Sequence, residues 1–204
     1  MVELQRESGT GGGADAADKD AALRESVIAA ADDLFYGRGI QSVGMDDVRQ
    51  ASGVSLKKLY SLFSSKERLV LAVLARRHGM WTDGVTARVD AETDPRLRLL
   101  AIYDYLSEWF ADDSFRGCGF INSFGELGVV TPAVAEYTRD HKESFQRYVA
   151  ELVEQAGAPE ELAPQLAILA EGAQTTAAIA GTGDAAVHAR RAAEVLIDVA
   201  TSAS

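Results

Sequence analysis

Residues 45–63 read MDDVRQASGVSLKKLYSLF, and this stretch decides the fold of the N-terminal third of the chain. Val48 and Ala51 are spaced to pack the inner face of a first short helix. Gly53 suits a sharp turn, in which a side chain would clash or would need a positive φ. Ser55 is placed to cap a second short helix by accepting a hydrogen bond from an exposed backbone N–H. This spacing predicts a helix-turn-helix.

The second short helix, expected over residues 55–62, has an apolar face and a polar face. Leu59 and Leu62 point inward at helical spacing. The side chains that face outward are Leu56, Lys57, Lys58, Tyr60 and Ser61, on a helix short enough to enter a DNA major groove. An ordinary helical hairpin with a solvated lysine pair would have the same spacing, so residues beyond the turn must separate the two interpretations.

The rest of the chain is also helical in pattern, which predicts an all-α fold. Further helices are expected at about 21–36, 65–88, 95–111, 120–128, 132–155, 159–180 and 184–200. Each of the four prolines lies where a helix could start, and no stretch has the alternation typical of a strand. Residues 1–20 lack apolar periodicity and are rich in glycine, which predicts a flexible tail.

The net charge of −11 is unevenly distributed along the 204 residues. Residues 21–77 carry nine basic and six acidic groups, whereas residues 78–204 carry nine basic and twenty acidic groups. Because salt screens charges beyond about 8–10 Å, a basic segment on an acidic chain can still bind phosphate. The overall acidity therefore does not exclude a nucleic-acid partner.

Composition and local patterns exclude several other classes of protein. The longest unbroken apolar run, residues 69–75, is far shorter than the roughly 20 residues of a membrane-spanning helix. The N-terminus has no signal-peptide pattern, so we expect a cytoplasmic protein without a membrane partner. One cysteine, Cys118, excludes an internal disulfide framework, and three widely spaced histidines do not predict a metal site.

The residues after the second short helix separate the two interpretations, because the chain continues as LYSLFSSKE over residues 59–67. Residues 21–77 resemble the DNA-binding domain of the TetR family of bacterial one-component regulators. The matching positions are Ala30, Leu34, Phe35, Gly39, Met45 to Val48, Ala51 to Ser55, Leu59, Tyr60, Phe63 and Ser65 to Glu67. The resemblance implies a three-helix DNA-binding domain over residues 21–77 and a larger helical ligand-binding and dimerisation domain over residues 78–204.

The resemblance also implies which residues meet DNA. Tyr60 and Lys66 hold positions at which the family contacts phosphates, and Lys57 and Lys58 occupy outward positions on the recognition helix. Gly44 stands where the family usually has a capping Ser or Thr, so one hydrogen bond to phosphate is expected to be missing. The implied DNA-binding set is Ser42, Gly44, Ser55, Leu56, Lys57, Lys58, Tyr60 and Lys66.

Residues 78–204 contain a concentration of aromatic side chains between positions 103 and 124, in a part that resembles the start of the family's central helix. A few polar groups in an apolar cavity are what an inducer site needs. The predicted ligand-binding set is Tyr103, Trp109, Phe110, Cys118, Phe120, Asn122, Phe124, Glu126 and Gln174. A plain hydrophobic core is the alternative for each of these aromatic residues.

Apolar residues recur at helical spacing on the last two helices, and the resemblance places a four-helix dimer interface there. The predicted interface residues are Leu162, Leu166, Leu169, Ala173 and Thr176 on one helix and Ala192, Val195, Leu196 and Val199 on the other. The alternative is that these stripes belong to the chain's own hydrophobic core. At least part of each stripe must be buried in that core.

An enzyme is not expected, because the chain lacks paired Glu-x-x-His motifs, a nucleophile elbow and a Walker loop. The sequence predicts a homodimeric regulator, with no cofactor and no metal, that binds a double-stranded DNA operator. We expect a repressor that a small apolar or aromatic inducer releases from a pseudo-palindromic site. Three alternatives stay open: redox or electrophile sensing through Cys118, a helical interaction module that has lost DNA binding and, least favoured, a helical enzyme.

Overall fold

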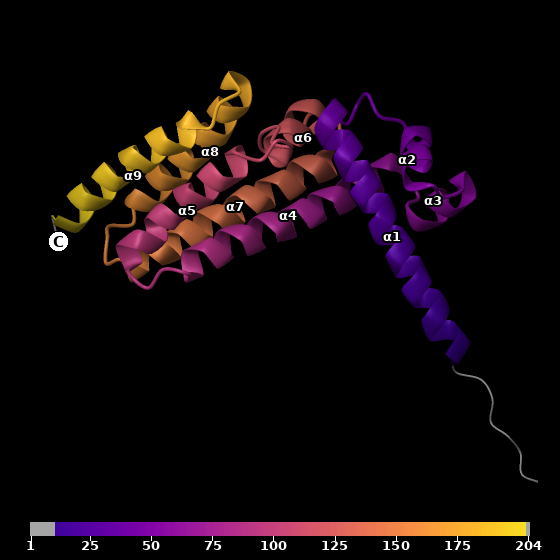
Figure 1. The fold of residues 1–204 in the computed structure, drawn as a ribbon, viewed down its shortest axis with the longest axis horizontal. Coiled ribbons are helices and arrows are strands. Elements are labelled where there is room, and N and C mark those ends of the chain that lie inside the picture. Colours follow the sequence, from indigo (N-terminus) through magenta and orange to yellow (C-terminus); the bar gives the residue numbers. More distant parts are fainter. Residues whose placement is uncertain (1–10, 203–204) are drawn as a thin grey trace, which may run out of the picture. The chain divides into compact units, whose positions relative to one another are not determined.

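The computed structural model describes the backbone of residues 11–202 and the side chains of residues 17–202. Over this range the chain forms nine α-helices and no strand, which confirms the all-α prediction (Figure 1). The helices are α1 (Gly11–Arg38), α2 (Met45–Ser52), α3 (Leu56–Leu62), α4 (Lys66–Asp90), α5 (Pro95–Phe110), α6 (Gly119–Leu127), α7 (Pro132–Gln155), α8 (Leu162–Ala180) and α9 (Asp184–Ser202). None of them is long and apolar enough to cross a bilayer.

The first helix is longer than the sequence pattern indicated. α1 begins at Gly11 instead of about residue 21, so residues 11–20 are helical and the prediction of a flexible tail is wrong for them. Residues 17–20 are exposed, so this part of α1 buries no apolar face and its sequence carries no helical periodicity, although Ala is a strong helix former. Residues 1–10 lie outside the described part.

The chain divides into two compact units between Val73 and Leu74. The division falls inside α4, a few residues before the boundary expected after residue 77. Because one helix runs through both positions, no loop or change of composition marks the boundary in the sequence.

In the first unit α1, α2 and α3 pack around a small apolar core. Val27 of α1, Val48 of α2 and Leu59 of α3 have no exposed surface. Burial of side chains of this size stabilises a fold by about 1.5–3 kcal/mol each, so these contacts fix α3 against the other two helices. Ala51, which we expected beside Val48, is exposed because the short α2 buries only a narrow stripe.

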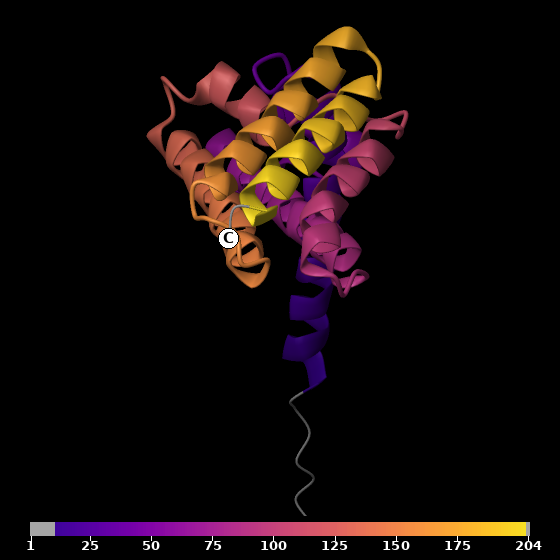
Figure 2. The same cartoon turned by 90° about the vertical axis from the view of Figure 1, so that its left-hand side faces the viewer.

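In the second unit α5, α7, α8 and α9 surround a second core, with α8 beside α9 and α6 packed on α7 (Figure 1 and Figure 2). Leu106, Val149, Leu166 and Ala193 are fully buried there. α8 is rich in alanine, and small side chains let neighbouring helices approach closely.

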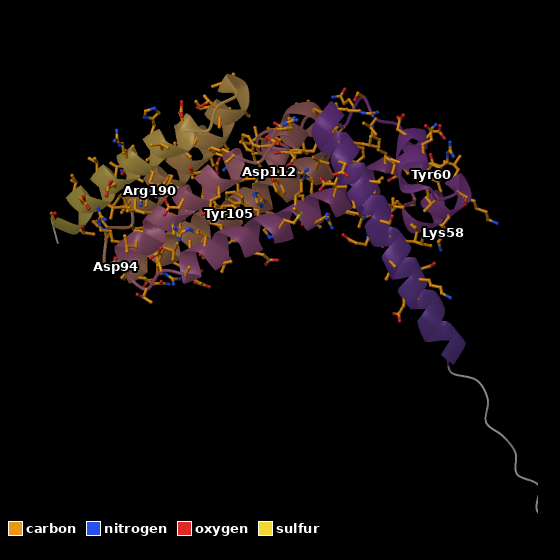
Figure 3. All side chains as sticks on the ribbon, in the orientation of Figure 1. Lys58, Tyr60, Asp94, Tyr105, Asp112 and Arg190 are labelled. Carbon is orange, nitrogen blue, oxygen red and sulfur yellow. The ribbon has the colours of Figure 1, made fainter. Side chains whose placement is uncertain are left out.

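Two local features set the start of α5 and its packing against α4, and Figure 3 labels Asp94 and Tyr105, which take part in them. α5 begins where the Asp94 carboxylate accepts hydrogen bonds from the backbone N–H groups of Arg96 and Leu97, at 2.8 and 3.1 Å. Tyr105 of α5 lies over Gly84 of α4, where an added β-carbon would be only 2.6 Å from the tyrosine hydroxyl oxygen. The glycine therefore leaves the space that the ring occupies.

Candidate nucleic-acid interface and effector site

The turn between α2 and α3 has the geometry that the sequence predicts. Gly53 adopts φ 71°, in the left-handed region that favours glycine, and its N–H donates to the Arg49 carbonyl at 3.0 Å. Ser55 precedes α3, and its hydroxyl oxygen accepts from the Lys58 backbone N–H at 3.2 Å. The turn and the cap together hold α3 at a fixed angle to α2.

The two predicted DNA-binding residues before α2 have local roles in the fold. The Ser42 hydroxyl donates to the Arg38 carbonyl at 2.7 Å. Gly44 has no side chain to cap α2, and the Asp47 carboxylate accepts instead from the Gly44 N–H at 2.7 Å. The start of α2 is therefore stabilised without the Ser or Thr usual in the family.

α3 presents an exposed face that includes four of the predicted residues, and the structure separates its two lysines. Leu56 is 44% exposed and Tyr60 is 47% exposed, and Lys57 lies on the surface with them. Lys58, which is labelled in Figure 3, is only partly exposed, and its ammonium forms an ion pair with the Asp20 carboxylate on α1. Lys57 is thus open to a partner, whereas Lys58 is held by the protein.

Lys66, at the start of α4, has a structural contact that the sequence did not indicate. Its ammonium donates to the Ile40 carbonyl at 2.6 Å and lies 5.9 Å from the Phe35 ring centroid. The lysine therefore ties α4 to the loop before α2, and its predicted contact with phosphate stays a prediction.

In the second unit an aromatic cluster is centred on Trp81 of α4. The Trp81 ring centroid lies 5.3 Å from that of Tyr105, 5.4 Å from that of Trp109 and 5.7 Å from that of Phe145. These are the distances and tilted geometries that aromatic pairs prefer. Trp81 and Phe145 were not predicted, because each is far along the chain from the aromatic-rich segment and no local pattern connects them.

The cluster continues to the end of α5. Phe115 lies 5.0 Å from Trp109 and 4.7 Å from Phe110 by ring centroid. The structure therefore brings two of the predicted ligand-binding aromatics, Trp109 and Phe110, into one assembly. Trp109 is partly exposed and Phe110 is buried.

A second group joins α4, α6 and α7. The Phe120 ring stacks on His141, with centroids 3.5 Å apart, and the His141 Nδ1 lies 2.8 Å from the His78 Nδ1. Burial, and then the nearby charges of Lys142 and His78, lower the pKa of His141 to about 3. His141 is therefore neutral at pH 7, and one ring donates the shared hydrogen bond to the other.

Cys118, just before α6, is buried beside a charged pair. The Lys142 ammonium on α7 lies 3.8 Å from the Cys118 sulfur and 3.4 Å from a Glu171 carboxylate oxygen on α8. The thiol thus has a cation next to it, which the sequence could not indicate because the two residues are 24 positions apart.

Other members of the predicted ligand set do not line a closed site. Tyr103 is fully buried, and its hydroxyl donates to the Leu166 carbonyl at 2.8 Å, so it belongs to the core. Asn122 and Phe124 are exposed, and the Asn122 amide donates to the Arg116 carbonyl at 3.1 Å. Both side chains are exposed because the short α6 buries Phe120 and Ser123 instead, and their contact with a ligand stays a prediction.

The two remaining polar residues of the set differ from each other. Gln174 is buried in α8, with its amide donating to the Ala170 carbonyl at 3.4 Å. Glu126 is partly exposed. In the part of the chain with placed side chains, no group of three or more His, Cys, Asp or Glu residues could hold a metal ion.

The predicted dimer stripes fall partly inside the chain's own core. Leu162, Leu166 and Ala173 are at most 5% exposed, so they have no surface to give to a partner. Leu169 and Leu196 are partly buried against the same core, and Ala192 is also partly exposed. Periodicity finds the apolar faces but does not separate a core face from an interface face.

The exposed side chains of α8 and α9 include some of the predicted positions and others that the prediction omits. Val195 is 63% exposed and Val199 is 66% exposed, as the α9 stripe requires, and Thr176 is exposed on α8. Ile168 and Ile179 on α8, which are not in the predicted set, are 69% and 83% exposed.

Two models of known families match the chain, and together they cover more than half of it. Residues 27–73 match the family described as bacterial regulatory proteins of the tetR family. Residues 95–193 match the tetracyclin repressor-like C-terminal domain. The two matched ranges correspond to the DNA-binding unit and to the larger helical unit.

A curated relative is the HTH-type transcriptional activator FasR of Mycolicibacterium smegmatis, which is 33% identical over 130 residues. The matched residues are 64% of this chain and 58% of that protein, so the match spans less than two thirds of the relative's length.

Solved structures of other regulators share the fold of the chain. A TetR-family transcriptional regulator from Streptomyces coelicolor matches with a TM-score of 0.83 and 24% identity, over 89% of this chain and 97% of that one. A TetR-type regulator from Streptomyces avermitilis matches with a TM-score of 0.77 and 26% identity, over 87% and 97% of the two chains. The helix-turn-helix geometry, the two family models and these relatives together establish that the chain belongs to the TetR family of bacterial transcriptional regulators.

Proposed function

We propose that this regulator binds a pseudo-palindromic DNA operator as a homodimer and that a small molecule bound in the second unit releases it. The exposed face of α3 carries this proposal. Leu56, Lys57 and Tyr60 stand accessible on a helix fixed by the Gly53 turn and the Ser55 cap. Such a helix fits a major groove, where side chains reach base edges and phosphates.

The proposed dimer uses the exposed apolar side chains of α8 and α9. Ile179, Val195 and Val199 are each more than 60% exposed, on helices whose other faces are packed into the core. Exposed apolar patches of this kind mark interaction surfaces. A two-fold dimer presents two α3 helices to half-sites about 34–36 Å apart, which is why the operator is expected to be pseudo-palindromic.

The proposed effector site is the aromatic cluster around Trp81 together with the His78–His141 pair. Both Trp81 and His78 lie on α4, the helix that begins in the DNA-binding unit. A ligand that moves α4 would therefore act on both units, and a coupling of about 1–3 kcal/mol would change DNA affinity about 5–150-fold. A mostly apolar, aromatic compound suits the cluster, and the acidity of residues 78–204 disfavours an acidic one.

The direction of regulation has two candidates. A repressor that covers its promoter is the first, because release by a ligand then needs only a loss of DNA affinity. An activator is the second, because the 33% identical relative is named as one. Transcription in vitro from the recovered operator, with and without protein, distinguishes a fall in transcript from a rise.

A second trigger rests on Cys118. The Lys142 ammonium lies 3.8 Å from its sulfur, and reactive cysteines are found in electropositive surroundings of this kind. Cys118→Ser should then abolish release from DNA by a peroxide or an electrophile. Trp109→Ala should instead weaken the response to an identified aromatic inducer. If Trp109→Ala leaves that response unchanged, the aromatic site is wrong.

The test of the main proposal is an unbiased selection of operator DNA with purified full-length protein. We expect enrichment of a pseudo-palindrome, with Tyr60→Ala and Lys57→Ala each reducing the enrichment. A matched control is Arg139→Gln, which removes an exposed charge from the second unit. Recovery of a single asymmetric half-site bound by monomers would contradict the proposal.

A further inference from the structure

A groove of about 390 Å³ lies in the first unit, between α1, the C-terminal end of α3 and the first turns of α4. Its lining residues are Arg24, Leu62, Phe63, Ser64, Arg68, Leu71 and Ala72. All of them belong to the DNA-binding unit, and none belongs to the DNA-binding set that the sequence predicts. Arg24 of α1 and Arg68 of α4 therefore line the same groove.

The two arginines keep their charge available. The Arg24 guanidinium carbon lies 4.5 Å from the centroid of the buried Phe63 ring, a stack that positions the guanidinium without neutralising it. Both arginine side chains are exposed, and across residues 17–202 neither forms an ion pair with a carboxylate. The planar guanidinium group suits a phosphate, because its N–H groups can donate to two oxygens at once.

Two lysines of this unit already have partners within the protein. Lys58 is paired with Asp20, and Lys66 donates to the Ile40 carbonyl. In the first turns of α4 it is therefore Arg68 whose side chain is left for a partner, and the Ser64 hydroxyl is exposed beside it. The groove is therefore lined by two guanidinium groups, which can bind an anion, and by no carboxylate that would neutralise them.

The groove lies at the C-terminal end of α3, the helix that is proposed to enter the DNA. A helix with its side chains is about 10–12 Å in diameter and fills a major groove about 12 Å wide, so the phosphate ridges flank a helix that lies there. α3 contains seven residues and so spans about 10 Å, which keeps its C-terminal end close to those ridges. Leu62, Phe63 and Ser64 are the residues at that end, and they form one wall of the groove.

We propose that the groove between Arg24 and Arg68 binds a phosphate of the DNA backbone at the ridge beyond the C-terminal end of α3. This inference rests on the proposed function, in which α3 enters the major groove. For each phosphate that the protein neutralises, the plot of the logarithm of the DNA-binding constant against the logarithm of salt concentration becomes steeper by about 0.9. The contact in each protomer would thus strengthen binding about fivefold at 0.15 M salt, and about thirtyfold per dimer.

The test compares Arg24→Gln, Arg68→Gln and the double variant with Arg139→Gln, an equal charge change in the second unit. Affinity for an operator duplex and for an unrelated duplex is measured by fluorescence anisotropy at several salt concentrations. We expect the groove variants to lower the salt slope by about one per protomer and to weaken both duplexes equally. Arg24→Lys, which keeps the charge and can keep the stack, should restore most of the slope.

A second measurement locates the phosphate. Uncharged methylphosphonates replace single phosphates of the operator, one position at a time. At one position we expect the replacement to lower the DNA affinity of the wild type and to leave that of the double variant unchanged. Groove variants whose salt slope equals that of Arg139→Gln would overturn the inference. A second result would also overturn it: inorganic phosphate stabilises the wild type but not the double variant, while the two proteins have the same salt slope for DNA binding. Wild-type protein that binds neither duplex would instead overturn the proposed function.

Discussion

The ammonium of Lys58, on the recognition helix, forms an ion pair with the carboxylate of Asp20, 38 residues earlier on α1. A DNA phosphate would offer the same ammonium a negative partner of the same kind. In the proposed complex, Asp20 would therefore compete with DNA for one of the two lysines on α3. Lys57, one position earlier, has no such restraint and is exposed.

The first prediction concerns this pair. Asp20→Asn should release Lys58, strengthen binding to every DNA sequence and raise the salt slope by about 0.9 per protomer. The measurement is the dissociation constant of a random duplex at several salt concentrations. Asp18→Asn is the matched control, because it removes a carboxylate of the same helix that is not paired with Lys58. Equal effects of the two variants would show that only the overall charge matters.

The second prediction separates two lysines by their role in folding. Lys66→Ala should lower the free energy of unfolding by about 1.5–3 kcal/mol, because it removes a charged hydrogen bond to the Ile40 carbonyl. Lys57→Ala should change it by less than about 0.5 kcal/mol, because that side chain is exposed. Urea denaturation of both variants provides the comparison. If Lys66→Ala weakens DNA binding at unchanged stability, its role is only to contact phosphate.

The third prediction concerns the dimer. Ile179→Glu and Val195→Glu should give folded monomers that no longer bind operator DNA, because both side chains are exposed. Ala173→Glu should instead unfold the protein, since Ala173 is 5% exposed and a carboxylate there would be buried without a partner. Sedimentation reports the oligomeric state and circular dichroism the fold. A protein that stays dimeric after both surface changes has its interface elsewhere.

The fourth prediction concerns acid stability. His141 has a pKa of about 3 in the folded protein and about 6.5 when unfolded, so between these values the unfolded state binds one more proton. The free energy of unfolding should therefore fall as the pH drops below about 6.5, by up to roughly 1.4 kcal/mol per unit from this site.

His141→Phe provides the comparison, because it keeps a ring that can stack on Phe120 but cannot titrate. Urea denaturation at pH 7, 6 and 5 should give a shallower loss for this variant than for the wild type. Parallel losses would show that His141 is not the buried neutral group that its surroundings indicate.

The sequence is sufficient to predict the helix-turn-helix, because short-range rules determine it. Gly53 needs a left-handed turn, Ser55 caps the next turn of helix, and Val48 and Leu59 point inward by helical period. Each of these relationships spans fewer than a dozen residues. The family resemblance relies on the same local spacing.

The effector site and the dimer surface are less predictable, since they depend on how distant helices pack. Trp81 and Phe145 meet at 5.7 Å although 64 positions separate them, and no periodicity links them. On α8 the stripe of Leu162, Leu166 and Ala173 proved to be core, whereas Ile179 faces outward. Helical period identifies both faces, but only the packed structure separates them.

The closeness of Gly84 to the Tyr105 ring has an evolutionary consequence. A single added methyl at position 84 would have to displace the ring, which is in contact with Trp81 at 5.3 Å by centroid. The two positions therefore share one fixed volume, and they should vary together among orthologues. A bulkier residue at 84 is expected only with a smaller one at 105. Such compensated pairs would keep the spacing of α4 and α5 while changing the chemistry of the aromatic cluster around Trp81.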